Sequence, residues 1–204
     1  QNYFLLGIYC IDYLKNQGSD ENFIFFEHKI YEDEVFEQQV INYLNDAMNH
    51  QQLSINFNQI IDIKRGFVWQ YESELVPENM DIDSKYLLSV AKKRHRLFDL
   101  EKYHIEMVCQ FLSSLEKETE KLIKITIPVS KETFLDANFN PYIFGLFQKY
   151  EIPAEFIRFK VKMFFLNSIQ FLCQFNELSV SVIFLDTTHV VVALSYPFIS
   201  LHLD

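Results

Sequence analysis

The sequence predicts an α/β fold with a mainly parallel sheet or barrel. Beyond residue 53, segments with the spacing of short strands alternate with segments with the spacing of amphipathic helices, an order typical of parallel sheets. A β-hairpin opens this series. The chain has 204 residues, of which 49% are hydrophobic and 21 are Phe, which is enough for a sizeable core. We therefore expect one good-sized domain, or one domain with a fragment of another.

The N-terminal part predicts a helix, a short strand and a second helix. Apolar residues at helical spacing over 3–16 are followed by Gly18, a residue favoured just after a helix. Residues 23–28 indicate a strand. Apolar residues recur at helical spacing over 33–49, so this segment is expected to be an amphipathic helix that links two units.

The hairpin is predicted from two strand-like segments around a short turn. Residues 53–63 alternate, the sequence KRG supplies the turn, and residues 67–75 form the second strand. That second strand ends in two acids, Glu72 and Glu74, although the rest of it is bulky and apolar. Glu74 is expected to face solvent or a neighbouring lysine.

The remaining chain alternates between predicted helices and strands. One helix has Pro141 in its first turn, where proline is tolerated. The expected helices are 84–97, 100–115, 140–150 and 164–175, and the expected strands are 122–129, 156–162, 178–186 and 198–204.

The composition disfavours several classes of function. The net charge of −10 argues against non-specific nucleic-acid binding and against an anionic membrane surface, because both require a positive face. The cysteines Cys10, Cys109 and Cys173 are odd in number and far apart, which indicates a reduced, intracellular set. The sequence contains neither an apolar run of membrane-spanning length nor the basic start of a signal peptide. We therefore expect a cytoplasmic location.

The order and the local sequences of these segments resemble those of the EAL domain, the barrel that hydrolyses cyclic di-GMP in bacteria. FNQIIDIKRGFVWQYESEL looks like that family's opening, in which YQPIV is followed by a turn and the EAL signature, and LFDLEKYHIEMVCQFLSSL is similar to its next helix pair. ITIPVS stands where the family has a strand ending in NLS, and EIPAEFIRFKVKM resembles the segment ending in an ITE-like motif. FLD and PFISLHLD resemble the DDFG strand and the strand ending in KID. Upstream, IDYLKNQG and NFIFF resemble the last helix and strand of a GGDEF (cyclase) domain, a type often fused ahead of EAL domains.

This resemblance implies three parts. Residues 1–30 are expected to be the C-terminal remnant of a GGDEF-like domain, residues 31–52 a linking helix, and residues 53–204 a degenerate, partial EAL-like barrel of the TIM type. Because a complete (β/α)₈ barrel takes about 250 residues and at least about 200, this one is expected to be incomplete at its C-terminal end. Its open edge would be covered by further chain or by a protein partner, such as a second copy.

The resemblance also implies a site with two Mg²⁺ or Mn²⁺ ions, held by carboxylates at the C-terminal ends of the strands. The signature Glu is kept as Glu72, and one of two paired aspartates is kept as Asp186. Leu185 stands for the other aspartate. At the other family positions, this chain has residues unsuited to the family's chemistry. Asn58 stands in place of Gln, Val76 in place of the phosphate-binding Arg, Lys92 in place of Glu, Pro128 in place of the Asn ligand, Met163 in place of the Glu ligand and His202 in place of Lys.

Two carboxylates cannot by themselves hold two metal ions. We therefore predict a catalytically inactive EAL-like domain, without a metal or other cofactor, that acts as a regulatory or protein-interaction module. One alternative is a metal-independent cyclic di-GMP receptor that uses the barrel mouth. A second is an active phosphodiesterase with a site rebuilt from Glu72, Asp186 and His202.

Other motifs have plainer interpretations. The basic run KKRHR at 92–96 suggests phosphate recognition, but a charged run on a helix is usually a solvated face. His28 and His104 lie in acidic segments and are expected at the surface. His189 and His202 lie near the expected barrel mouth, and packing or hydrogen bonding is the favoured role for both.

Overall fold

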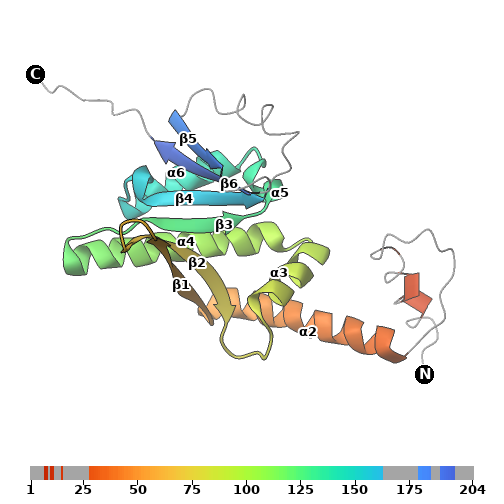
Figure 1. The fold of residues 1–204 in the computed structure, drawn as a ribbon. Helices are drawn as coiled ribbons and strands as arrows, with labels where there is room; N and C mark the ends of the chain where they lie inside the picture. Colours follow the sequence, from red (N-terminus) through yellow and green to blue (C-terminus); the bar gives the residue numbers. More distant parts are fainter. Residues whose placement is uncertain are drawn as a thin grey trace, which may run out of the picture. The chain divides into compact units, whose positions relative to one another are not determined.

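The computed structural model describes most of the chain. The described residues are 28–162, 179–184 and 189–195, together with five helical residues near the N-terminus, Gly7, Ile8, Cys10, Ile11 and Lys15 (Figure 1). They fall into two compact units. The first unit takes residues 1–54 and 77–97, and the second takes residues 55–76 and 98–204.

Within residues 28–97 of the first unit, two helices contact each other, α2 (His28–His50) and α3 (Ser84–Lys93). α3 begins at a capping aspartate, because the Asp83 side chain accepts the N–H of Tyr86 at 2.6 Å. Both helices bury one apolar stripe, as the spacing of their hydrophobic residues predicts. The buried apolar residues are Ile30, Val40, Leu44 and Ala47 on α2, and Leu87, Val90 and Ala91 on α3.

The predicted hairpin is formed by β1 (Leu53–Asp62) and β2 (Phe67–Pro77), which are neighbours in the sheet. Asp62 shapes the turn between them. Its side chain accepts the N–H groups of Lys64 at 2.9 Å and Arg65 at 3.1 Å, and its carbonyl accepts the N–H of Gly66 at 2.7 Å. Gly66 has φ +70°, a conformation that glycine adopts at little cost.

The sheet has six strands in the order β1-β2-β3-β4-β6-β5. β3 (Ile125–Val129) and β4 (Ile157–Lys162) continue in parallel from β2, which confirms the α/β prediction. β5 (Ser179–Phe184) and β6 (His189–Ser195) differ, because β6 pairs antiparallel with both β4 and β5. The sheet is therefore mixed, and its parallel part is β2–β3–β4.

The core of the second unit lies between one face of this sheet and two helices, α4 (Leu97–Thr119) and α6 (Phe139–Tyr150) (Figure 1). A short helix, α5 (Lys131–Phe134), and a 3₁₀ turn, η1 (Ala154–Phe156), complete the connections. Alternate residues of β3 and β4 point into the core, and they are Ile125, Ile127, Val129, Ile157, Phe159 and Val161. Of the described helices, none has the length and apolar character needed to cross a membrane.

Several boundaries differ from the sequence prediction. α2 begins at His28 instead of residue 33, α3 ends at Lys93 instead of residue 97, and α4 continues to Thr119 instead of ending at residue 115. Strand β6 was not predicted. The segments 164–175 and 198–204, and nearly all of 3–16 and 23–28, lie outside the described residues. The domain boundaries at residues 30 and 52 remain predictions.

The helices end without glycine. Among the described residues other than glycine, a positive φ of 55–57° occurs at Gln51, His95, Glu120 and Glu151. Each lies within two residues of a helix C-terminus, where glycine is common. An L-residue in this left-handed conformation costs about 1–2 kcal/mol, so a chain with only 4 Gly retains strain at these four ends.

Candidate functional site

The face of β2, β3 and β4 opposite the core carries polar side chains. Because side chains alternate along a strand, Thr126 and Pro128 on β3 share this face with Arg158 and Lys160 on β4. The strand register places Thr126 beside both Glu72 and Arg158, and Pro128 beside Lys160. Glu72, the predicted signature position, thus has neighbours on this face from the parallel strands β3 and β4.

Glu72 forms an ion pair with Lys160. Both carboxylate oxygens of Glu72 lie 3.0 Å from Nζ of Lys160. The two side chains are 28% and 25% exposed, so solvent reaches the pair only in part. The negative charge of Glu72 is therefore balanced by a cation that belongs to the chain itself.

A second polar contact lies beside the first. Nη1 of Arg158 donates to the buried Gln70 side chain at 2.8 Å, and its guanidinium lies 4.9 Å from the centre of the Trp69 ring. Burial lowers the pKa of Arg158. Among the described residues, neither Nε of Arg158 nor the hydroxyl of Thr126, both of which are buried, has a hydrogen-bond partner. Thr126 is only 1% exposed, so this face contains buried polar groups whose hydrogen-bonding capacity is unused.

The described residues do not fit a pair of divalent metal ions. Mg²⁺ and Mn²⁺ require several oxygen ligands at fixed geometry. Within residues 28–162, and the other described positions, no group of three or more His, Cys, Asp or Glu side chains could hold a metal ion. Glu72 contacts an ammonium group, and Pro128 has no side-chain oxygen to offer.

Three of the other predicted site positions, Asn58, Val76 and Lys92, lie among the described residues. Asn58 lies on β1 with its Nδ2 3.5 Å from Glu74 Oε2, and both side chains are exposed. Val76 is half-buried on β2, and Lys92 is exposed on α3. The positions that lie outside the described residues are Met163, Leu185, Asp186 and His202.

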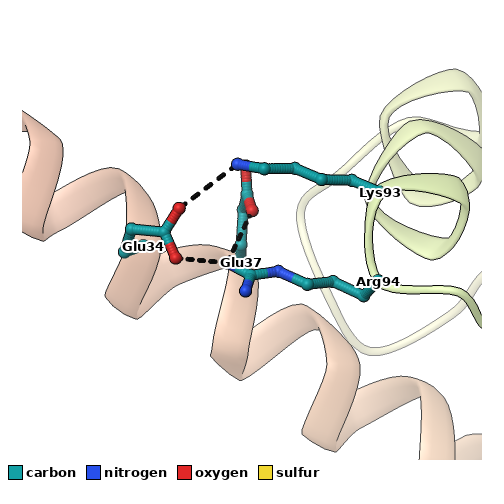
Figure 2. A network of polar contacts seen from close by, with 4 residues as sticks. All are labelled: Glu34, Glu37, Lys93 and Arg94. Atoms are coloured by element: carbon teal, nitrogen blue, oxygen red, sulfur yellow. Dashed lines mark hydrogen bonds and ion pairs between the residues drawn. The ribbon is translucent and has the colours of Figure 1, made fainter. Parts of the chain in front are cut away.

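The basic run at 92–96 is partly an ion-pair network. Lys93 Nζ lies 3.2 Å from Glu34 and 2.8 Å from Glu37, and Arg94 also contacts both acids, with 2.9 Å to Glu37 (Figure 2). Burial raises the pKa of Glu34, but its hydrogen bonds to Arg94 and Lys93 outweigh burial and lower it. The expectation of a solvated face is therefore wrong for these two cations, whose charges are balanced by carboxylates of α2.

Two buried titratable residues on α4 were missed from the sequence. His104 is 5% exposed, not at the surface as predicted, and burial lowers its pKa to about 4. Glu101 is also buried and accepts the N–H of Ser130 at 2.7 Å and its hydroxyl at 2.8 Å. Burial nevertheless raises the pKa of Glu101. Helical spacing supplied the signal, since Leu100, His104 and Val108 follow one another at intervals of four.

Comparison with known proteins identifies the fold through structure alone. No protein-family profile and no curated protein matches the chain. The EAL domain of FimX from Xanthomonas citri, in complex with c-diGMP, matches with a TM-score of 0.55 and 12% identity over 62% of this chain and 50% of that chain. The FimX EAL domain from Pseudomonas aeruginosa, bound to c-di-GMP, matches with a TM-score of 0.53 and 19% identity over 66% and 54%.

A longer protein matches in the same way. The S helix-GGDEF-EAL chain of LapD from Vibrio cholerae, in its apo form, gives a TM-score of 0.52 and 16% identity over 61% of this chain and 30% of that one. The chain spans about half the length of the two FimX domains. At these identities the similarity concerns the fold and not the activity. The α/β sheet described here is therefore that of the EAL-type, TIM-like barrel, present in part.

Proposed function

We propose that the chain is a catalytically inactive EAL-like domain of a bacterial cyclic di-GMP signalling protein, which acts as a regulatory or protein-interaction module. The observation that carries this proposal is the ion pair between Glu72 and Lys160, at 3.0 Å from both carboxylate oxygens. Metal-assisted phosphodiester hydrolysis needs cations that activate a water molecule and stabilise the developing charge. An ammonium group supplies one positive charge but cannot activate water as a metal ion does.

The neighbourhood of the pair supports the same proposal. A divalent ion that used Glu72 as a ligand would have to displace the ammonium group of Lys160. The residue paired in register with Lys160 is Pro128, which has no side-chain oxygen to coordinate such an ion. Because hard cations need several oxygens at once, a single freed carboxylate holds them weakly.

A second candidate function is a metal-independent receptor for cyclic di-GMP. The two similar FimX EAL domains are in complex with this dinucleotide. Within the part of the chain that the structure describes, the buried hydroxyl of Thr126 and Nε of Arg158, both on this polar face, have no hydrogen-bond partner. Such groups could donate to a phosphate oxygen without a metal ion.

The N-terminal assignment belongs to this proposal as well. We propose that residues 1–30 are the end of a GGDEF-like domain and that α2 links it to the barrel. The LapD chain, whose name includes a GGDEF and an EAL domain, supports this order. The proposed partners are proteins, including a second copy of the chain, and we expect a cytoplasmic location.

Calorimetry separates these functions. We expect no binding heat with Mn²⁺, and the same result for the Glu72→Gln variant. Cyclic di-GMP binding in the micromolar range without metal would favour the receptor if it is lost in Arg158→Met and kept in Lys85→Met, a change at an exposed lysine of α3. Tight Mn²⁺ binding that disappears in Glu72→Gln would contradict the proposed loss of metal chemistry.

A further inference from the structure

Helix α2 is held within the first unit in different ways along its length. Its C-terminal half completely buries three apolar side chains, those of Val40, Leu44 and Ala47. Over residues 28–39, in contrast, the buried side chains are those of Ile30 and Glu34. Apolar burial therefore dominates in the second half of α2, whereas the first half buries a carboxylate.

The C-terminal half of α2 is also fixed by Tyr43. The hydroxyl of Tyr43 donates to the carbonyl of Gln52 at 3.2 Å and accepts the N–H of Glu78 at 3.1 Å. Both partners belong to the first unit, and they lie just before and just after the hairpin in the sequence. This half of the helix is therefore anchored by apolar burial and by hydrogen bonds to two separate segments.

The N-terminal half of α2 is fixed to α3 by charge. The residues involved, which we call the charge cluster, are Glu34, Glu37, Lys93 and Arg94. Each acid of the cluster contacts both cations, and the two acids lie one helical turn apart (Figure 2). The side chains of the acids are 4% and 13% exposed, and those of the cations are 25% and 24% exposed. Two negative and two positive charges thus balance each other in a place that water reaches only in part.

One aromatic contact accompanies the charge cluster. The rings of Phe36 on α2 and Tyr86 on α3 have centroids 5.8 Å apart. Both side chains are more than a third exposed, so this contact buries little apolar surface. The charge cluster is therefore the main polar link between the N-terminal half of α2 and α3 among the described contacts.

A cluster of this kind favours two states over intermediate ones. Removing one partner of a buried ion pair leaves the other charge uncompensated, which is strongly destabilising. Separating all four charges at once returns each of them to water, so hydration offsets much of the lost attraction. Apolar side chains receive no such compensation when they are exposed. The N-terminal half of α2 can therefore detach as a whole at lower cost than the C-terminal half.

We propose that the charge cluster is a latch, which docks and releases residues 28–39 of α2 as one segment while residues 40–50 stay in place. In the released state Lys93 and Arg94 lose their carboxylates, so the basic run at 92–96 becomes available to other anionic groups. The latch makes the docking of α2 on α3 sensitive to any force or charge that acts on the N-terminal end of α2. It goes beyond the proposed interaction role, and it holds whether or not residues 1–30 come from a GGDEF-like domain.

The first test is hydrogen exchange of the full chain, followed residue by residue. A released segment as short as 28–39 is not a stable helix by itself, so its amides exchange with solvent whenever the latch opens. In the unaltered chain we expect amides 32–39 to exchange together and about tenfold or more faster than amides 43–50. In the Glu34→Gln/Glu37→Gln variant the exchange of amides 32–39 should rise by a further factor of about ten or more, because two partly buried cations lose their partners.

Glu32→Gln is the matched control. It makes the same chemical change on the same helix, but the Glu32 side chain is 65% exposed and its ion-pair partner, His28, lies on α2 itself. Exposed pairs of this kind contribute little to stability, so the exchange of amides 32–39 should stay within about twofold of that in the unaltered chain.

The second test separates the latch from a local effect of the altered α2 residues. Adding Lys93→Met and Arg94→Met to the Glu34→Gln/Glu37→Gln variant removes the two uncompensated cations from α3. The exchange of amides 32–39 should then fall by about threefold or more relative to the variant without acids, because no unpaired charge is left at the contact. A local effect on α2 would leave the exchange unchanged by substitutions on α3.

Three results would overturn the proposal. Amides 32–39 could exchange no faster than amides 43–50 in the unaltered chain, the variant without acids could exchange no faster than Glu32→Gln, or the substitutions on α3 could fail to reduce that exchange. Amides 105–112 of α4, in the second unit, should exchange equally slowly in every variant, which shows that a released segment is not a lost fold.

Discussion

The buried histidine on α4 makes the acid stability of the second unit predictable. His104 has an ordinary pKa of 6.5 in the unfolded chain and a pKa of about 4 in the folded one, because burial disfavours its charged form. The folded state thus binds fewer protons, and stability falls as the pH falls from 6.5 towards 4. At 1.36 kcal/mol per pKa unit, the full loss is about 3 kcal/mol, of which about 2 kcal/mol has occurred by pH 5.

The assay is urea unfolding followed by fluorescence, at pH 7 and pH 5. The single Trp, Trp69, belongs to the same unit as His104, so its signal reports on the relevant transition. His104→Leu removes the titrating group and should reduce the difference in free energy of unfolding between the two pH values by about 2 kcal/mol. His28→Gln is the control, because the side chain of His28 is 78% exposed, as the sequence predicted. An unchanged pH difference in His104→Leu would refute the reasoning.

Three further predictions concern other parts of the fold. Burial raises the pKa of Glu101, so its contribution to stability falls as the pH rises from 4.5 through that raised pKa. Glu101→Gln should therefore stabilise the fold more at pH 7 than at pH 4 in the same urea assay, while still bonding to Ser130. Glu120, which follows the last residue of α4, has a left-handed conformation with φ 55°. Because glycine adopts this conformation at little cost, Glu120→Gly should raise the free energy of unfolding by about 0.5–1 kcal/mol, and the melting temperature with it. A lower melting temperature would contradict the inferred strain. A double-mutant cycle with Glu72→Gln and Lys160→Met, measured by urea unfolding, should give a coupling free energy of about 1–2 kcal/mol, because the two side chains are only about a quarter exposed. A coupling free energy near zero would mean that the ion pair does not form.

Much of the fold follows from sequence spacing. The hairpin is set by Asp62 and Gly66, and the strands at 125–129 and 157–162 alternate or run as buried strands do. β6 was missed because its sequence HVVVALS follows β5 after only a few residues, at a point where the parallel pattern predicts a helix. Only the pairing with β4 makes it a strand of this sheet. Long-range pairing of this kind has no local signal in the chain.

The site was predictable in part. The retained acid at position 72 was identified through the resemblance, but its partner Lys160 lies 88 positions away and was not. A signal was present in IRFKVK, because Arg158 and Lys160 alternate with core residues and must share the other face of β4. Whether such cations face solvent or a carboxylate depends on the strand order, which single-sequence spacing does not determine.

The most direct test of the central claim is turnover of cyclic di-GMP in the presence of Mn²⁺. The ion pair between Glu72 and Lys160 predicts no hydrolysis above the uncatalysed rate, both for the unaltered chain and for Glu72→Ala. Hydrolysis by the unaltered chain that disappears in Glu72→Ala would contradict the account. It would show that Glu72 still serves a metal site in spite of Lys160.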